Sequence, residues 1–219
     1  MTNESQEDTA RRPRGRPKTA SDTQRRAGVL QVARTLFEEQ GFAGTTTDMV
    51  AARARMSKQT LYRLFRNKAE LFRALVEDHR STMLALPLKE HDLPLAQAIA
   101  TIFRFDIAPE AERERAVFLH FAMRTVTDDP EVHAILREAG PDASRAMLSA
   151  WLETRAANGE IVLEDADSAA RMLMDMVFGA MLHFADPRTG PPEGPQRQAR
   201  LDHLHRCVRI FLDGVRPKG

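Results

Sequence analysis

The stretch GTTTDMVAARARMSKQTLYRLF, residues 44–65, predicts two short helices separated by a tight turn. One of the threonines at 45–47 can cap the first helix and Ser57 the second, because their hydroxyl groups accept hydrogen bonds from free N–H groups of a first helical turn. In the second helix Leu61 and Phe65 are four residues apart, so they share a face that we expect to be buried. Two short helices joined in this way are typical of a helix-turn-helix, whose second helix enters the major groove of DNA.

The other face of the second predicted helix is polar and carries positive charge. Gln and Arg side chains can make bidentate hydrogen bonds to adenine and guanine edges in the major groove. An alternative is that this face is only a charged surface on a small helical packing, because short helical hairpins are common. The residues on this face are Lys58, Gln59, Tyr62, Arg63 and Arg66.

Positive charge is concentrated at the front of the chain. Residues 11–19, RRPRGRPKT, contain five basic residues and no acidic one. Residues 11–80 carry 16 Lys and Arg against 7 Asp and Glu, whereas residues 81–219 carry 16 against 21. A basic N-terminal part followed by an acidic remainder is expected when only one end of a protein binds nucleic acid, although a solvated tail would have the same composition.

Within this basic run, Arg14-Gly15-Arg16-Pro17 is similar to the core of an AT-hook. Gly15 has no side chain, so the backbone can approach the floor of a narrow minor groove while Arg14 and Arg16 extend along it. Basic tails are frequent, but an arm directly before a helix-turn-helix is a known way to reach the adjacent minor groove. We therefore expect Arg14 and Arg16 to contact DNA.

Helical periodicity extends in both directions from the central stretch, and no convincing alternating strand interrupts it. A first helix is expected from Asp22, as its N-cap, to about Gln40, with Gly41 in a left-handed C-terminal position. Asn67 caps a further helix that lasts until about Leu86. These helices predict an all-α fold.

Beyond Pro87, several expected helices begin at a proline. One short helix is expected to end at Gly140, and a longer one to begin at Pro141. Two long helices, at about 166–185 and 196–213, close the chain. We divide the sequence into a basic arm (1–21), a DNA-binding domain (22–85, with the helix-turn-helix at about 46–65) and a helical body (86–219).

Composition and motifs exclude several classes of protein. No apolar run approaches the roughly 18 residues that cross a bilayer, and no secretory signal is recognisable. The single cysteine, Cys207, fits a reducing cytoplasm, so we expect a cytoplasmic, nucleoid-associated protein. The sequence contains no catalytic motif, and His203, His205 and Cys207 alternate on a helix and cannot converge on one ion. We therefore predict no enzyme, no metal and no cofactor.

The run LQVARTLFEEQGFAGTTTDMVAARARMSKQTLYRLFRNKAELFRAL, residues 30–75, resembles the TetR family of transcriptional regulators. The elements that carry the resemblance are LF-x-E-x-GF-x-G-TT, S-x-x-TLY-x-x-F and K-x-E-LF, which lie between residues 23 and about 80. The resemblance implies that Tyr62 contacts a phosphate and that Lys68 lies where the start of a helix favours one. The other DNA contacts that it implies, or that the polar face adds, are Thr46, Thr47, Ser57, Lys58, Gln59, Thr60 and Arg63.

One position departs from the family pattern, which reads A-G-V-S at the turn where this chain has Ala54-Arg55-Met56-Ser57. The glycine normally supplies a positive φ, and another residue there is disfavoured by about 1 kcal/mol. Either the turn adopts a slightly different conformation or Arg55 is tolerated because it adds a cation beside the DNA; we favour the first, with Arg55 playing no special part.

The resemblance implies that the helices after residue 85 form a ligand-binding and dimerising domain, similar to the AefR-like branch. Two apolar stripes predict a four-helix bundle between two protomers, although the same stripes could instead close the core of one protomer. The stripes are Leu201, Leu204, Val208 and Phe211 on the last helix, and Ala169, Leu173, Met176, Val177 and Ala180 on the helix before it.

Methionine and aromatic residues of the body predict a pocket for a small hydrophobic ligand, because thioethers adapt to several apolar shapes. His120 and His183 are its candidate polar groups, although Met stripes and histidines are more often ordinary core residues. The candidate lining residues are Phe103, Phe118, Phe121, Met123, Met147, Trp151, Met174 and Phe178.

The sequence thus favours a homodimeric repressor that a hydrophobic ligand releases from a palindromic operator in double-stranded DNA. The alternative is a constitutive DNA-binding or nucleoid-associated protein without an inducer. An enzyme with a DNA-binding head is the least favoured interpretation.

Overall fold

The computed structural model describes residues 21–88, 93–125, 130–183 and 192–217, and their side chains except at 123–125, 182 and 183. Every regular element in these residues is a helix, so the predicted all-α fold is confirmed. The elements are α1 (Asp22–Gly44), α2 (Thr47–Arg53), α3 (Lys58–Leu64), α4 (Lys68–Met83), α5 (Leu95–Ile102), α6 (Pro109–Thr125), α7 (Pro130–Arg137), η1 (Glu138–Asp142), α8 (Ala143–Ala157), α9 (Ala166–His183) and α10 (Gly194–Gly214).

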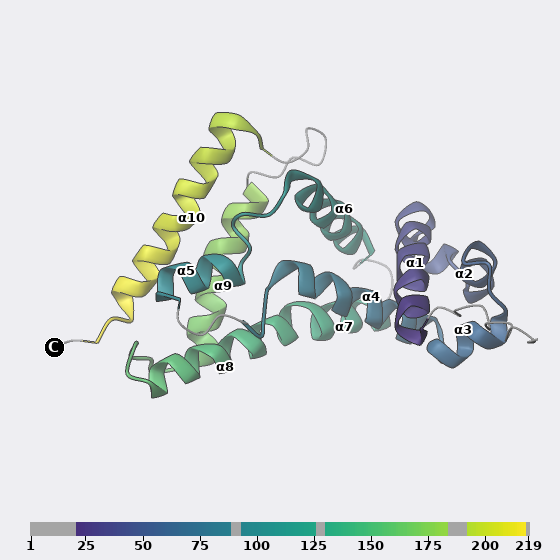
Figure 1. Ribbon diagram of the computed structural model, residues 1–219, viewed down its shortest axis with the longest axis horizontal. Helices are drawn as coiled ribbons and strands as arrows, with labels where there is room; N and C mark the ends of the chain where they lie inside the picture. Colours follow the sequence, from purple (N-terminus) through teal and green to yellow (C-terminus); the bar gives the residue numbers. More distant parts are fainter. Residues whose placement is uncertain (1–20, 89–92, 126–129, 184–191, 218–219) are drawn as a thin grey trace, which may run out of the picture.

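The molecule is elongated, with α1, α2 and α3 at one end and α9 and α10 at the other (Figure 1). Helix α4 links α1 to the middle of the molecule, because it packs against α1 as well as α6 and α7. None of the described helices is long and apolar enough to cross a membrane.

Side-chain caps fix the starts of the helices in the DNA-binding part. Thr46, Ser57 and Asn67 each accept a hydrogen bond from the backbone N–H three residues later, at 3.2, 3.1 and 2.7 Å, which confirms the predicted caps. The predicted cap of α1 is wrong by one residue. Ser21 caps that helix, because its hydroxyl binds the N–H of Gln24 and the Gln24 side chain returns a bond to the N–H of Ser21.

The ends of α1 and α4 also differ from expectation. Gly41 has a positive φ of 73°, as expected, but its ψ of 173° is extended rather than left-handed helical, and helical structure resumes as far as Gly44. Helix α4 ends at Met83 rather than near Leu86. Both differences lie at helix ends, where local sequence patterns define boundaries least well.

The turn between α2 and α3 keeps a left-handed residue even though it lacks the family's glycine. Arg55 has φ 53°, so the expectation of an altered turn is wrong. The N–H of Arg55 binds the carbonyl of Ala52 at 3.1 Å, and the N–H of Met56 binds that of Ala51 at 3.0 Å. This pair of bonds is a Schellman motif, which satisfies two carbonyls at the end of α2 and holds Arg55 in its unfavourable conformation.

The expected break at Gly140 and Pro141 is also absent. Helix α7 continues through the π-helix η1 into α8, so the predicted end at Gly140 is wrong. Proline lacks an N–H and its ring clashes with an earlier carbonyl in a regular α-helix, whereas the wider π-turn accommodates it. The carbonyl of Ala139 within η1 accepts a hydrogen bond from Arg80 of α4 at 3.0 Å.

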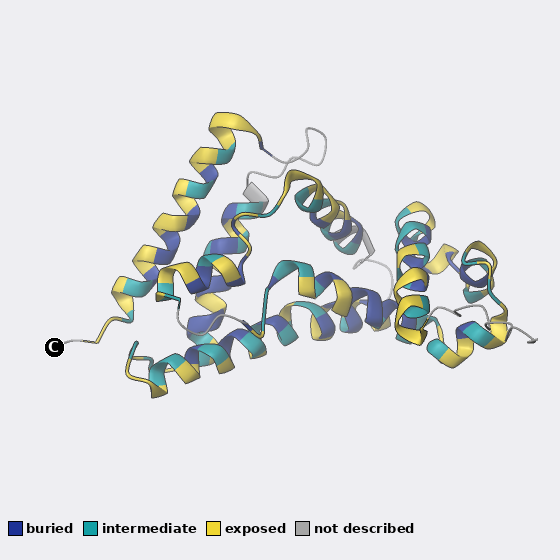
Figure 2. Ribbon diagram, in the orientation of Figure 1, coloured by how far each residue is buried: buried dark blue, intermediate teal, exposed yellow. Residues whose placement is uncertain are grey.

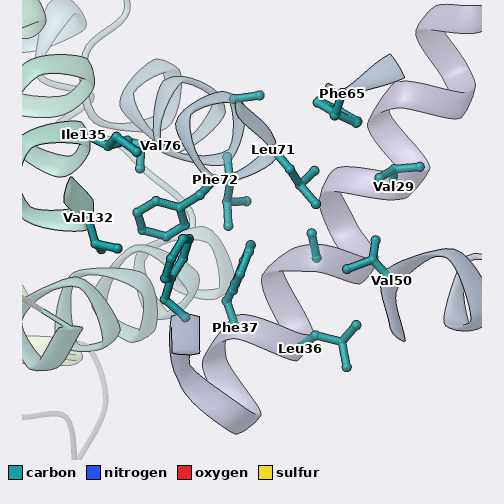
Figure 3. Close-up of a cluster of buried hydrophobic side chains, with 14 of the residues drawn as sticks. Val29, Leu36, Phe37, Val50, Phe65, Leu71, Phe72, Val76, Val132 and Ile135 are labelled. Atoms are coloured by element: carbon teal, nitrogen blue, oxygen red, sulfur yellow. The ribbon is translucent and has the colours of Figure 1, made fainter. Parts of the chain in front are cut away.

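The first hydrophobic cluster joins α1–α4 to α6, α7 and η1. Phe72 of α4 is completely buried, and its ring lies 5.3 Å from that of Phe37, 5.2 Å from that of Phe42 and 6.2 Å from that of Phe121. Figure 3 shows Val132 and Ile135 of α7 on one side of Phe72, with Phe37 of α1 on the other. The core of the DNA-binding part is therefore continuous with the body.

The second cluster holds α5, α8, α9 and α10 together. Leu204 and Val208 of α10 are buried in it with Leu173 and Val177 of α9, all within one protomer. Figure 2 shows these buried faces turned inward and an exposed face along the outer side of α10. The prediction that these stripes form the seam between protomers is therefore wrong for these four residues.

The turn geometry predicts the effect of restoring glycine at position 55. Arg55→Gly should raise the free energy of unfolding by about 1 kcal/mol, because glycine adopts a positive φ without steric strain. Chemical denaturation of the full chain measures this change. In the control, Ala52→Gly places glycine inside α2 and should lower the free energy of unfolding by about 1 kcal/mol. A destabilised Arg55→Gly protein would show that Arg55 makes a favourable contact that outweighs the strain.

Candidate nucleic-acid interface and internal cavity

Helix α3 presents its polar face to solvent and its apolar face to the core. Leu61 and Phe65 are almost completely buried, whereas Gln59, Tyr62 and Arg63 are exposed. Phe65 is further covered by the guanidinium of Arg26, which lies 4.3 Å from the ring centre. The buried residues fix the rotation of α3, so its exposed polar face is a rigid feature of the surface.

Hydroxyl groups form two close pairs at this surface, one of which joins the start of α2 to α3. Thr47 Oγ1 and the phenolic oxygen of Tyr62 lie 3.1 Å apart. Ser57 Oγ and Thr60 Oγ1 lie 2.8 Å apart at the start of α3. In each pair one hydroxyl donates to the other, which leaves one O–H group in each pair free to donate to a phosphate oxygen.

Two of the cations at this surface are held by carboxylates. Lys58 Nζ donates to Asp48 Oδ2 at 2.6 Å, and this hydrogen bond raises the pKa of Lys58. Arg63 Nη2 donates to Asp22 Oδ1 at 3.3 Å. Both pairs are solvent-exposed, so little free energy is needed to redirect either cation toward a phosphate or a base.

Lys68 is placed differently from the expected free phosphate ligand. Its Nζ donates to the carbonyl of Phe42 at 2.9 Å and lies 4.1 Å from the centre of the Phe42 ring. The side chain therefore ties the start of α4 to the end of α1. The start of α4 can still offer backbone N–H groups to an anion. Arg14 and Arg16 lie outside the described residues.

The body contains a cavity of about 490 Å³ between α4, α6, α7, η1, α9 and α10. Its volume is in the range of sites for small organic ligands. Of the predicted lining residues, Phe118, Met174 and Phe178 border it, and so does His120. The side chains of Met123 and His183 lie outside the described residues.

The other four predicted lining residues do not border the cavity, so the prediction is wrong for them. Phe103 is completely buried in the second hydrophobic cluster, where its ring packs against Phe178 at 5.4 Å. Phe121 faces the first cluster instead. Trp151 packs against the second cluster beneath the guanidinium of Arg155, and Met147 does not line the cavity either.

Sequence reasoning missed the charged residues of the cavity wall, including Glu112, Arg115 and Arg200. Arg115 and Arg200 continue apolar stripes: Arg115 precedes Phe118 and Leu119 by three and four residues, and Arg200 precedes Leu204 by four. A charged residue on the buried face of an amphipathic helix is the pattern that could have revealed them. Among the described residues, no group of three His, Cys, Asp or Glu side chains is arranged to hold a metal ion.

His79 lies where the cavity meets the core. It is buried, its Nε2 has no hydrogen-bond partner among the described residues, and its ring stacks on Phe118 at 4.0 Å. Burial, reinforced by the positive charges of Arg34 and Arg115, lowers the pKa of His79 to about 3. His79 is therefore neutral at physiological pH and can offer a ligand one nitrogen as a donor or an acceptor.

Known proteins share both parts of this arrangement. The family model for "Bacterial regulatory proteins, tetR family" matches residues 29–75, and the model for the "AefR-like transcriptional repressor, C-terminal domain" matches residues 107–214. The HTH-type transcriptional regulator YvkB of Bacillus subtilis is 24% identical over 190 residues, which are 85% of this chain and 95% of YvkB.

Two further relatives extend the comparison. The negative transcriptional regulator IcaR of the biofilm operon icaADBC in Staphylococcus epidermidis is 34% identical over 64 residues, 29% of this chain and 35% of IcaR. The solved structure of the SmeT–triclosan complex is 25% identical and superposes with a TM-score of 0.62, covering 90% of this chain and 93% of that one.

These matches cover the helix-turn-helix and most of the body, and the matched families are transcriptional regulators rather than enzymes. Together with the capped α2–turn–α3 geometry, they establish what kind of protein this is: the chain belongs to the TetR family of DNA-binding transcriptional regulators.

Proposed function

We propose that the protein is a homodimeric repressor that leaves a palindromic operator when a small, largely apolar ligand fills the cavity. The observation that carries this proposal is the chain of aromatic contacts between the cavity and the DNA-binding end. Phe118 borders the cavity, packs against Phe121 at 5.8 Å, and Phe121 packs against Phe72. Phe72 in turn contacts Phe42, whose ring and carbonyl hold Lys68 at the start of α4.

A second connection joins the cavity wall directly to α1. The guanidinium of Arg34 lies 5.7 Å from the centre of the Phe118 ring and forms an ion pair with Asp78 at 3.4 Å. A ligand that displaces Phe118 would therefore disturb α1 as well as α4. Because packed cores have discrete arrangements rather than a continuous range, such a displacement can reorient the DNA-binding end as a unit.

In the DNA-bound state α3 enters the major groove, with Gln59 and Arg63 reading bases and Tyr62 contacting a phosphate. The hydroxyls of Thr46, Thr47, Ser57 and Thr60 lie at the starts of α2 and α3, and we assign them to contacts with the DNA backbone. The basic arm, through Arg14 and Arg16, would occupy the adjacent minor groove.

For the dimer, the surfaces left exposed on α9 and α10 replace the predicted stripes. Met172 on α9 is 56% exposed and Ile210 on α10 is 60% exposed. Gly179 lies seven residues after Met172, and no atom lies within 4 Å of the position that a Cβ would occupy there. Exposed apolar residues on both helices, with a position without a side chain two turns further along α9, are suited to close packing against helices of a second protomer.

The SmeT–triclosan complex supports the small-molecule part of this proposal, because a protein of similar fold was solved with triclosan. IcaR supports the repressor part, since it is a negative regulator. The proposal as a whole is tested by sequencing the genomic fragments that the purified protein retains, with and without a panel of apolar compounds that includes triclosan. We expect one palindromic site to be enriched and then lost with an active compound. Retention that no compound changes would support constitutive DNA binding instead.

Base reading by α3 predicts a change in sequence preference. Gln59→Ala should weaken operator binding by about 1–3 kcal/mol and relax the preference at one base pair in each half-site. Asp48→Asn is the matched comparison, because it removes a negative charge and frees Lys58 without touching a base-reading residue. It should strengthen binding to all sequences about equally, as measured by titrations on operator and scrambled DNA. An unchanged preference in Gln59→Ala would exclude base reading by that residue.

Charged substitutions on the proposed dimer surface should convert the dimer into a folded monomer. Met172→Glu combined with Ile210→Glu should dissociate the dimer, because each substitution buries a charge in the interface without a partner. The free energy of unfolding measured on the isolated protomer should change by less than about 0.5 kcal/mol, since both positions are exposed there. Sedimentation velocity measures the dissociation. As a control, Val117→Glu places the same charge at an exposed position of α6 and should leave the dimer intact. A wild-type protein that is monomeric at micromolar concentration would refute the dimer.

A further inference from the structure

The wall of the cavity carries an excess of positive charge. Its lining is mostly apolar, yet among the described residues it includes several guanidinium groups and a single carboxylate, that of Glu112. The guanidinium groups belong to Arg80, Arg104, Arg115, Arg137 and Arg200.

Two of these arginines are neutralised by carboxylates. Arg200 of α10 is paired with Glu112 of α6, with Nη2 donating to Oε2 at 2.9 Å. Arg137 is paired with Asp142 at 2.5 Å. In the described part of the wall, these pairs leave no carboxylate for the remaining three arginines, which donate to main-chain carbonyls instead. Those three are Arg80, Arg104 and Arg115, bonded to the carbonyls of Ala139, Ser81 and Thr82 respectively.

Arg115 is the most unusual of the three, because only 6% of its surface is exposed. Within the described residues its one hydrogen bond runs from Nη2 to the Thr82 carbonyl, and its buried Nε has no partner. Burial, together with the neighbouring charge of Arg104, lowers the pKa of Arg115 to about 10. The side chain is therefore still a cation at neutral pH, and a buried cation without an anionic partner is strongly disfavoured.

The surroundings of Arg115 define the rest of a binding site. Phe118 and Leu119 follow it on α6, and Met174, Phe178 and Leu204 border the same cavity from α9 and α10. The neutral ring of His79 borders it from α4 and has an unpaired Nε2. The cavity thus combines an uncompensated guanidinium, a neutral polar group and an apolar wall.

We propose that the effector is an amphipathic organic carboxylate, whose anionic group binds Arg115 and whose apolar body fills the space between α6, α9 and α10. A carboxylate matches the planar guanidinium and supplies the negative charge that the wall lacks. The apolar lining selects a monoanion with a large hydrocarbon part over a small, highly charged ion. This inference rests on the proposed ligand-responsive function and specifies the chemistry of its ligand.

The test uses two probes of one shape, biphenyl-4-carboxylate and its neutral amide, biphenyl-4-carboxamide. Isothermal titration calorimetry of the full-length protein at neutral pH measures both affinities. We expect the wild-type protein to bind the carboxylate about 10- to 100-fold more tightly than the amide, the range expected of hydrogen bonds to a charged group. Equal affinities, a preference for the amide, or no binding of either probe would overturn the proposal.

Substitutions then assign the preference to Arg115. Arg115→Met keeps much of the side-chain volume and should abolish the preference by weakening only the carboxylate. Arg113→Met is the matched control on the exposed side of the same helix and should bind both probes as the wild type does. Arg115→Lys keeps the charge but cannot donate two parallel hydrogen bonds to a carboxylate, so it should give an intermediate preference for the carboxylate. This variant replaces Arg115→Met in the test if Arg115→Met does not fold. A preference that persists in the Met or the Lys variant at the wild-type level would contradict the assignment.

Operator binding separates this inference from the function on which it rests. Release of operator by a neutral compound, together with equal affinity for the two probes, would overturn the carboxylate proposal and leave the ligand-responsive repressor standing. Tight, Arg115-dependent binding of the carboxylate without any effect on operator affinity would support the site and count against ligand-controlled release.

Discussion

The packing of Phe72 on α4 is the constraint on which the rest of the structure depends. This ring touches Phe37 and Phe42 of α1 on one side and Phe121 of α6 on the other. Helix α4 therefore belongs to the DNA-binding part and to the body at once, and a small helix-turn-helix gains a larger core than its own residues could supply. The same contact means that α4 cannot move without changing the support of α1 and, through it, of α3.

The cavity lies at the body end of this arrangement. His79 and Phe118 form its inner boundary, and both belong to the helices that Phe72 joins. On the opposite side, the Arg200–Glu112 pair connects α10 to α6, so the same wall is linked to the helices that we propose for the dimer. A ligand that contacts this wall can thus bias the position of the DNA-binding end relative to the second protomer. The charges of the wall further define which ligands can do so.

The sequence predicted the features that depend on local patterns. Caps at Thr46, Ser57 and Asn67 and the buried pair Leu61 and Phe65 follow from hydrogen bonding and helical spacing within a few residues. These patterns, with the family resemblance, were sufficient for the all-α fold and for the exposed face of α3.

Two of the predictions that failed depend on local backbone geometry that residue type alone does not determine, and the others depend on contacts distant in the sequence. Arg55 stays left-handed because two backbone bonds hold it, and the helix passes through Pro141 because a π-turn accommodates the ring. Leu204 and Val208 have the spacing of an interface, but periodicity does not say whether the covering surface belongs to the same protomer or to another. Phe103 and Phe121 were assigned to a pocket by residue type, whereas the rotation of each helix turns them into the core.

The central claim is that occupation of the cavity reaches the DNA through the aromatic contacts of α4 and α6. The most direct test measures operator affinity with and without a saturating active compound in the wild type, in Phe118→Leu, and in Phe103→Leu as a buried control outside the cavity. The compound should lower operator affinity by about 5- to 150-fold in the wild type and in Phe103→Leu, the usual range of allosteric coupling. In Phe118→Leu the compound should still bind, and the operator should be retained. Release of operator from Phe118→Leu to the wild-type extent, with the compound bound equally well, would contradict the account.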